Sequence, residues 1–285
     1  MPTSTLTFAE KKRRSEKIVV ITAYDALTAA MVASAGVDAI LVGDSVGMVF
    51  AGYDTTLPVT MADMLYHTAA VVRGARKAFV IADMPFMSFQ GSHDEAVHNA
   101  GRFLKEAHAQ AVKLEGCDPE LVARLVGIGI PVMGHIGLTP QSVNALGGFR
   151  AQGKTAGSAA RIEEQARLLD EAGCFAIVLE CVPASLAARV TKKVRAATIG
   201  IGAGIQCDGQ VSVVNDLLGL STGYLPRHAK RYANFYAEGL DAVRSYVEEV
   251  RCGAFPGPEH SIEAAASETN PAPQRVSTPS EPPRP

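Results

Sequence analysis

The sequence predicts an α/β fold, a (β/α)8 TIM barrel with an N-terminal capping helix. Eight short apolar runs alternate with segments of helical periodicity, which is typical of a parallel sheet with helices outside it. Such a barrel needs about 250 residues, and the chain has 285. Its 47% apolar content and 26 glycines suit a large core with many turns. An open doubly wound sheet is the alternative, because the eighth run is poorly marked.

The predicted strands are short, apolar and rich in branched residues, as expected for strands buried on both faces. The last of them has the weakest pattern. In chain order they cover 18–22, 39–42, 78–83, 110–115, 131–135, 175–180, 198–202 and 217–221.

The helices are predicted from capping residues and from apolar residues at helical spacing. Thr7 and Glu10 fit a capping box, so a helix over 7–17 is expected to close the floor of the barrel. Residues 1–262 are assigned to a single catalytic barrel, and residues 263–285, rich in Pro, Ser, Glu and Ala, to a disordered tail. The other helices are predicted over 25–36, 60–74, 92–109, 118–129, 159–173 and 183–194, with one or two closing helices over 227–251.

Composition excludes several classes of function. The net charge of −2 and the pI near 6.4 give no electrostatic footprint for nucleic acid. No apolar run approaches the ~18–20 residues of a membrane span, and no signal peptide is recognisable. Five cysteines without a C-x-x-C pair are typical of reduced thiols. We therefore expect a cytoplasmic protein.

Polar residues follow the predicted strands at their carboxyl ends. In a parallel barrel these ends share one face, which is where barrel enzymes hold their sites. Taken singly, Asp83 could be a turn residue and Glu180 a salt-bridge partner, but the same placement after several strands favours a shared site. The residues are Asp44, Ser45, Asp83, Lys113, Glu115, His135 and Glu180.

Three of these carboxylates, Asp44, Asp83 and Glu115, have no Cys–His set beside them and favour a hard cation. Oxygen ligands suit Mg²⁺, which keeps several waters and leaves positions for substrate. Lys113 and Glu115 are two residues apart on a strand, so both face the barrel interior. There Lys113 pairs with a substrate anion or, alternatively, forms a salt bridge to Asp83.

Glu180 is the carboxylate left over after the metal set. A metal that polarises a carbonyl acidifies the adjacent C–H, and Glu180 can then act as general base. His135 either contacts the substrate, orients a ligand or is a satisfied interior histidine. Cys181 is expected to point outward and has no catalytic role. The run 200–204 resembles a phosphate-binding turn but lacks the Walker lysine and the dinucleotide spacing, so close backbone packing is favoured.

Several of these segments resemble the signature of the ketopantoate hydroxymethyltransferase family, in the family's order and over about residues 7–261. The matching segments are Val42-Gly43-Asp44-Ser45-Val46-Gly47-Met48, Leu57-Pro58-Val59-Thr60, Tyr66-His67-Thr68, Ala82-Asp83-Met84-Pro85-Phe86-Met87, Val112-Lys113-Leu114-Glu115-Gly116, Gly134-His135-Ile136-Gly137-Leu138-Thr139-Pro140-Gln141-Ser142, Leu179-Glu180-Cys181-Val182-Pro183 and Gly200-Ile201-Gly202-Ala203-Gly204.

The resemblance implies transfer of a hydroxymethyl group from 5,10-methylenetetrahydrofolate to 3-methyl-2-oxobutanoate, which gives ketopantoate for pantothenate biosynthesis. It implies that Asp44, Asp83 and Glu115 ligate or approach Mg²⁺, which chelates the 2-oxo acid and stabilises its enolate. Ser45 and Lys113 would contact the substrate, and Glu180 would abstract the C3 proton. A homodecamer is also implied. The long Gly-rich segment 136–157 would form a wall on the folate side.

Two segments depart from the family pattern. Asn215 stands where a histidine often precedes the aspartate, and His260-Ser261-Ile262 replaces the usual aromatic ending.

Two other functions are alternatives to the transferase. The nearest rival is a metal-dependent C–C or C–P lyase of the isocitrate lyase or phosphoenolpyruvate mutase type. Those enzymes usually carry a Lys-Lys-Cys-Gly loop, which this sequence lacks. A 2-oxo acid binding protein without activity would be suggested by a missing base, yet Glu180 is present.

Overall fold

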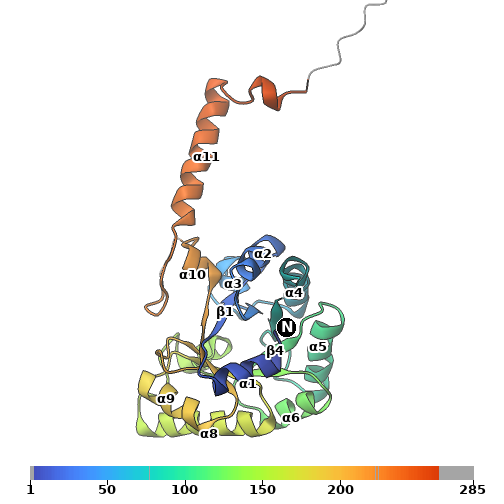
Figure 1. Ribbon diagram of the computed structural model, residues 1–285, viewed down its shortest axis with the longest axis vertical. Helices are drawn as coiled ribbons and strands as arrows, with labels where there is room; N and C mark the ends of the chain where they lie inside the picture. Colours follow the sequence, from blue (N-terminus) through green and yellow to red (C-terminus); the bar gives the residue numbers. More distant parts are fainter. Residues whose placement is uncertain (1–2, 77, 222, 224, 263–285) are drawn as a thin grey trace, which may run out of the picture. The chain divides into compact units, whose positions relative to one another are not determined.

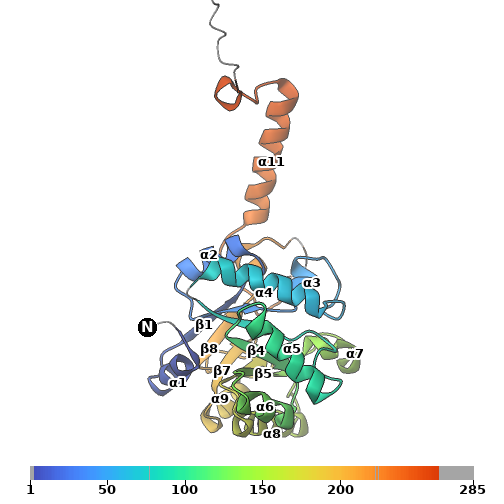
Figure 2. The ribbon, with the colours of Figure 1, turned by 90° about the vertical axis from the view of Figure 1, so that its right-hand side faces the viewer.

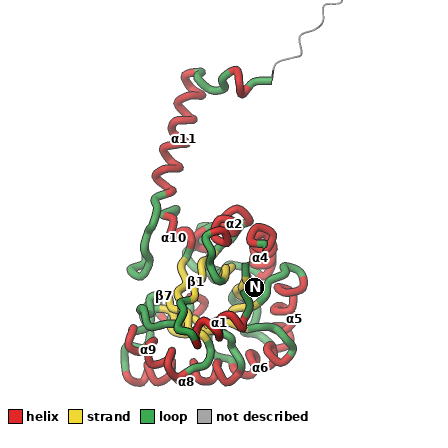
Figure 3. The backbone as a smooth tube through the Cα atoms, viewed as in Figure 1, coloured by secondary structure: helices red, strands yellow, loops and turns green. Residues whose placement is uncertain are grey.

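The computed structural model describes residues 3–76, 78–221, 223 and 225–262. Eight parallel strands close into a barrel in sequence order, each paired with its chain neighbours and the first with the last. The predicted fold class is therefore confirmed. Figure 3 shows the yellow strands inside a ring of red helices. The strands are β1 (Ile18–Thr22), β2 (Ala39–Val42), β3 (Phe79–Asp83), β4 (Ala111–Glu115), β5 (Val132–Gly137), β6 (Ala176–Glu180), β7 (Ala197–Ile201) and β8 (Gly209–Ser212).

Helices follow most strands and cover the outside of the barrel (Figures 1 and 2). The α-helices are α1 (Thr5–Arg13), α2 (Ala26–Ser34), α3 (Val46–Val49), α4 (Met61–Ala75), α5 (His93–Lys105), α6 (Pro119–Gly127), α7 (Val143–Leu146), α8 (Ala156–Ala172), α9 (Ala184–Lys193), α10 (Val214–Leu218) and α11 (Phe235–Cys252), and the 3-10 turns are η1 (Pro140–Ser142) and η2 (Pro258–His260).

Contacts divide the chain into two compact units, Met1–Tyr236 with the barrel and the residues from Ala237 onward. The predicted closing region contributes the single long helix α11. Residues 263–285, predicted as a disordered tail, lie outside the described residues, so the division at residue 262 stays a prediction.

Two expected element positions were wrong. The eighth strand is Gly209–Ser212, and residues 217 and 218 belong to α10. β8 escaped prediction because its Gln210 is exposed, so the segment is not a continuous apolar run. The first helix begins at Thr5 after Ser4, and Thr7 is inside it: the Thr7 hydroxyl accepts from the Ser4 backbone N–H at 3.1 Å.

The barrel interior has an apolar lower part. Inward side chains of every strand form one buried cluster, separate from the larger cluster between strands and helices. Phe8 of α1 belongs to the inner cluster and is 1% exposed. Its ring centroid lies 5.8 Å from that of Phe79 and 5.1 Å from that of Phe175. The expected role of the first helix as the barrel floor is therefore confirmed.

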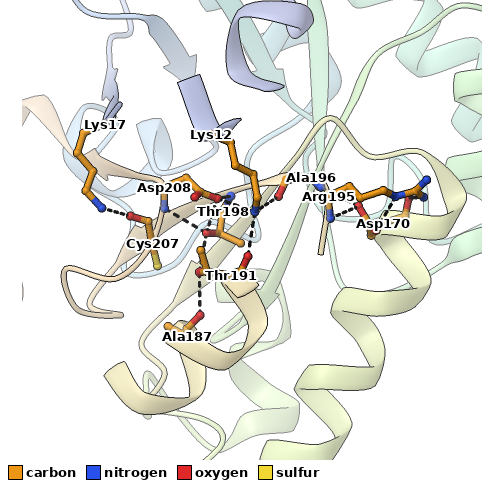
Figure 4. Close-up of polar contacts among 10 residues, drawn as sticks. All are labelled: Lys12, Lys17, Asp170, Ala187, Thr191, Arg195, Ala196, Thr198, Cys207 and Asp208. Carbon is orange, nitrogen blue, oxygen red and sulfur yellow. Dashed lines mark hydrogen bonds and ion pairs between the residues drawn. The ribbon is translucent and has the colours of Figure 1, made fainter. Parts of the chain in front are cut away.

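A polar cluster fastens α1 beside this floor (Figure 4). The Lys12 ammonium donates to the carbonyl oxygens of Thr191 and Ala196, at 3.0 and 2.8 Å, and to Asp208 Oδ2 at 2.8 Å. The same Asp208 oxygen accepts from the Thr198 backbone N–H at 2.8 Å. Lys12 thus joins α1 to the end of α9 and to the β7–β8 connection.

Candidate active site

The predicted site residues converge at the carboxyl ends of neighbouring strands. The register pairs Asp83 with Lys113 across β3 and β4, and Glu115 with His135 across β4 and β5. Asp83, Lys113 and His135 each lie two residues beyond an inward apolar residue of the floor cluster, such as Ile81 below Asp83, and Glu115 lies two residues beyond Lys113. Because side chains alternate along a strand, all four point into the barrel above the apolar layer.

Lys113 lies at the centre of this polar layer and is 3% exposed. Its Nζ lies 2.7 Å from Asp83 Oδ1, 3.9 Å from Glu115 Oε1 and 3.3 Å from His135 Nδ1. Burial opposes the charge, but the Asp83 and Glu115 carboxylates outweigh it and raise the pKa of Lys113. The alternative salt bridge to Asp83 is therefore present, and the ammonium also faces Glu115 and His135.

Asp44 and Asp83 form a buried acidic pair, 3% and 2% exposed. The Asp44 backbone N–H donates to Asp83 Oδ2 at 3.3 Å. Burial, and then the charges of Asp83 and Glu115, raise the pKa of Asp44 well above its ordinary value. Burial also raises the pKa of Asp83, against the effect of Lys113. Asp83 Oδ1 touches Lys113 without making a hydrogen bond of acceptable geometry.

Gly43, before Asp44, leaves room for the Ser45 side chain. A Cβ on Gly43 would lie 2.7 Å from Ser45 Oγ, so the hydroxyl would have to move. Ser45 Oγ lies 2.8 Å from the hydroxyl of Tyr24, a buried residue after β1. Burial raises the pKa of Tyr24 to about 12, so its hydroxyl stays protonated. Ser45 therefore faces the rim with a fixed neutral partner.

Glu115 is held by a residue that the sequence reasoning missed. The backbone N–H of Gln141 donates to Glu115 Oε2 at 2.9 Å, and the Gln141 side chain donates to Asp44 Oδ2 at 3.0 Å. Burial favours the neutral acid, but the contact with His135, the Lys113 charge and the Gln141 N–H lower the pKa of Glu115. Glu115 is therefore a buried carboxylate that stays ionised.

His135 connects Glu115 with the predicted base. Its Nδ1 lies 3.5 Å from Glu115 Oε1, and its Nε2 lies 3.2 Å from Glu180 Oε2 without hydrogen-bond geometry. Burial and the Lys113 charge oppose protonation, but the two glutamates outweigh them and raise the pKa of His135 to about 9. His135 therefore lies between two carboxylates that favour its protonated form, and the Glu180 side chain is the more exposed of the pair, at 16% against 3% for His135.

Two of the three predicted metal ligands, Asp44 and Asp83, fit a divalent cation, whereas Glu115 is already engaged by protein donors. Within residues 3–76, 78–221, 223 and 225–262, no three His, Cys, Asp or Glu side chains are arranged to hold a metal ion. Asp44 and Asp83 are adjacent buried carboxylates whose mutual repulsion a cation would relieve. Mg²⁺ is commonly held by one or two carboxylates together with waters and substrate. Both oxygens of Glu115 already face protein donors.

Comparison with known proteins decides the family. The model of the ketopantoate hydroxymethyltransferase family matches residues 2–258. The chain belongs to this family. It is 55% identical to the 3-methyl-2-oxobutanoate hydroxymethyltransferase of Carboxydothermus hydrogenoformans, over 90% of this chain and 94% of the relative. It is 51% identical to the enzyme of the same name from Enterococcus faecalis, over 92% and 96%.

The chain also superposes on solved structures of other enzymes, one of them named as a member of the superfamily of the rival function. Phosphonopyruvate hydrolase with oxalate and Mg²⁺ superposes with a TM-score of 0.57 at 13% identity, over 92% of both chains. A 2,3-dimethylmalate lyase of the phosphoenolpyruvate mutase/isocitrate lyase superfamily gives 0.54 at 16% identity, over 95% and 93%. At such identities the likeness shows a shared fold alone, and the family match favours the transferase over the lyase.

The glycine run after β7, part of the hydroxymethyltransferase signature, allows close packing as expected. A Cβ on Gly204 would lie 2.5 Å from the Cβ of Ala184, and Gly202 has a φ of +64°.

Cys181 points away from the acidic layer, with its Sγ 3.7 Å from His228 Nδ1. All five cysteines are free thiols. In the described part of the chain, no helix has the length and hydropathy to cross a membrane.

Proposed function

We propose that this chain transfers a hydroxymethyl group from 5,10-methylenetetrahydrofolate to 3-methyl-2-oxobutanoate, giving ketopantoate for pantothenate biosynthesis. Family membership supports the reaction, since the relatives named for it are matched over more than nine-tenths of their length. The observation that carries the proposal is that the acidic side chains at the carboxyl ends of the strands form two separate groups. A buried acidic pair lies beside Lys113, and a separate carboxylate, Glu180, lies beyond His135.

Asp44 and Asp83 would hold the divalent cation, and Glu115 would ligate or approach it. The cation, when bound, would polarise the 2-oxo group and so acidify C3. The Lys113 ammonium would stabilise negative charge on the substrate oxygens, and Ser45 would donate to the substrate carboxylate. The cation, the Lys113 ammonium and the Ser45 hydroxyl would together bind a small 2-oxo acid.

Glu180 would take the C3 proton. The C3–H electron pair then moves toward the 2-oxo oxygen, and C3 next forms a bond to the folate methylene carbon. One of the two C–N bonds of the methylene carbon breaks as the C3 bond forms, and water then replaces the second nitrogen and becomes the hydroxyl group. The two folate nitrogens take up the protons from C3 and from water, and tetrahydrofolate leaves. His135 keeps the Glu180 carboxylate oriented at the open end throughout. The segment between β5 and α8 is proposed as the folate side.

The test is deuterium exchange at C3 of 3-methyl-2-oxobutanoate, with Mg²⁺ and without folate. Wild type is expected to exchange, and Glu180→Gln to lose nearly all exchange while binding the 2-oxo acid normally by calorimetry. Glu120→Gln, an exposed glutamate of α6, is the matched control and should exchange like wild type. Exchange by Glu180→Gln at the wild-type rate would remove Glu180 as base.

Assembly and location are further parts of the proposal. A cytoplasmic homodecamer is proposed from the family resemblance, with a mass of ten 30.0 kDa subunits. Light scattering coupled to size exclusion measures this mass directly, and a monomer mass would refute the decamer.

A further inference from the structure

We propose that Gln141 is a positioning residue that sets the orientation of the Asp44 carboxylate, and through it the affinity of the site for a divalent cation. This role rests on the proposed function. The Gln141 side chain is nearly inaccessible, at 4% exposed, and lies on η1 after β5. It reaches back 97 residues in sequence to Asp44.

Both polar groups of the Gln141 side chain have hydrogen-bond partners. The side-chain Nε2 donates to Asp44 Oδ2 at 3.0 Å and to the backbone oxygen of Met84 at 2.9 Å. The side-chain Oε1 accepts from Gln90 Nε2 at 2.9 Å. Two acceptors therefore face the amide nitrogen and one donor faces the amide oxygen. A flipped amide would place oxygen against carboxylate, so the surroundings allow one orientation only.

The turn that carries Gln141 is itself fixed. Pro140 begins η1, and the Ser142 N–H closes the turn on the Thr139 carbonyl at 2.8 Å. One residue earlier, the Leu138 N–H donates to the Glu180 carbonyl at 2.8 Å. A rigid, anchored turn can hold a long side chain in one place at a small further loss of entropy.

This arrangement leaves one Asp44 oxygen for a ligand. Gln141 holds Oδ2 and so fixes the orientation of the carboxylate, while Oδ1 makes no hydrogen bond to any described residue. Groups that orient metal-binding carboxylates typically contribute 10–100-fold in metal affinity or activity.

A purely structural role makes a different prediction. The backbone N–H of Gln141 holds Glu115 at 2.9 Å whatever the side chain is. A side-chain substitution therefore keeps the anchored turn and the Glu115 contact, and it removes the Asp44 contact. If Gln141 only anchors the loop, stability should fall while cation affinity is retained. If it positions Asp44, cation affinity should fall.

The experiment titrates Mn²⁺ alone into the full-length protein and measures free Mn²⁺ by electron paramagnetic resonance. Gln141→Met keeps the side-chain length without the amide, and Gln141→Asn keeps an amide that is one methylene too short. Gln165→Met is the matched control, because Gln165 lies on α8, outside the segment between β5 and α8, and its side chain makes no hydrogen bond to any described residue. We expect both Gln141 variants to bind Mn²⁺ about 10–100-fold more weakly, with an unchanged Kd in the control.

An Mn²⁺ Kd within twofold of wild type in either folded Gln141 variant would overturn the role, and thermal unfolding shows which variants are folded. With Mg²⁺ present, C3 exchange should recover toward the wild-type rate as the Mg²⁺ concentration rises. Wild type that neither binds Mn²⁺ nor exchanges C3 would instead refute the proposed function. Normal wild-type behaviour with unaffected Gln141 variants would refute only the role of Gln141.

Discussion

Replacing Phe8 by alanine tests whether α1 is a structural part of the barrel. Phe8 is 1% exposed and packs against two other rings, those of Phe79 and Phe175. Truncating a buried phenylalanine costs about 3–5 kcal/mol, and each aromatic pair adds about 0.5–1.5 kcal/mol beyond the area it buries. With two pairs lost, we expect the upper part of that range, about 4–5 kcal/mol.

Thermal unfolding followed by circular dichroism measures the effect. For a barrel of this size, 1 kcal/mol shifts the midpoint by about 2–4 °C, so the variant should unfold about 10–15 °C below wild type. Leu6→Ala is the control, because Leu6 lies on the same helix but is 73% exposed, and it should change stability by less than about 0.5 kcal/mol. Equal shifts in the two variants would show that α1 does not seal the floor.

Three further perturbations follow from described contacts. Lys12→Met removes three hydrogen bonds of a charged donor and should lower the free energy of unfolding in urea by about 2–3 kcal/mol; an unchanged urea midpoint would contradict the role of the cluster in Figure 4. Because the pKa of His135 is raised from 6.5 to about 9, its stabilisation is complete below pH 6.5 and is lost as pH rises through 9. In metal-free protein, the stability difference between wild type and His135→Asn should shrink by about 3 kcal/mol over that interval, and a pH-independent difference would refute this. Gly137→Ala would place a Cβ 2.3 Å from the Glu180 carbonyl oxygen, at a φ of +97°, and should slow C3 exchange about tenfold or more. Gly101→Ala, whose Cβ would meet no atom within 4 Å, should exchange normally.

The periodicity of the sequence carried most of the fold. Strands buried on both faces give continuous apolar runs, and seven of the eight were found in this way. β8 was missed because Gln210 interrupts its apolar pattern. The N-terminal helix was placed two residues late because Thr7 and Glu10 imitate a cap that Ser4 provides. Local patterns cannot show which of two nearby hydroxyl residues meets the free backbone groups.

The candidate site was predictable where its residues belong to strands. Asp83, Lys113 and His135 follow from alternation along a strand and from the shared direction of parallel strands. Gln141 and Tyr24 come from connections, and their partners lie far away in sequence, so no spacing rule indicates them. The signal for Gln141 was indirect: it follows a proline in the long segment after β5, a segment that is unusual unless it shapes a site.

The interior of the barrel has an apolar lower layer and a charged upper layer, and this division affects which substitutions the enzyme tolerates. The lower layer keeps water from reaching the charged groups from below, so their attractions and repulsions are strong. Repulsion between Asp44 and Asp83 therefore lowers the stability of the folded protein as long as no cation is bound between them. Replacing Asp44 by asparagine should therefore make the folded molecule more stable while ending its activity, as is common where function opposes stability.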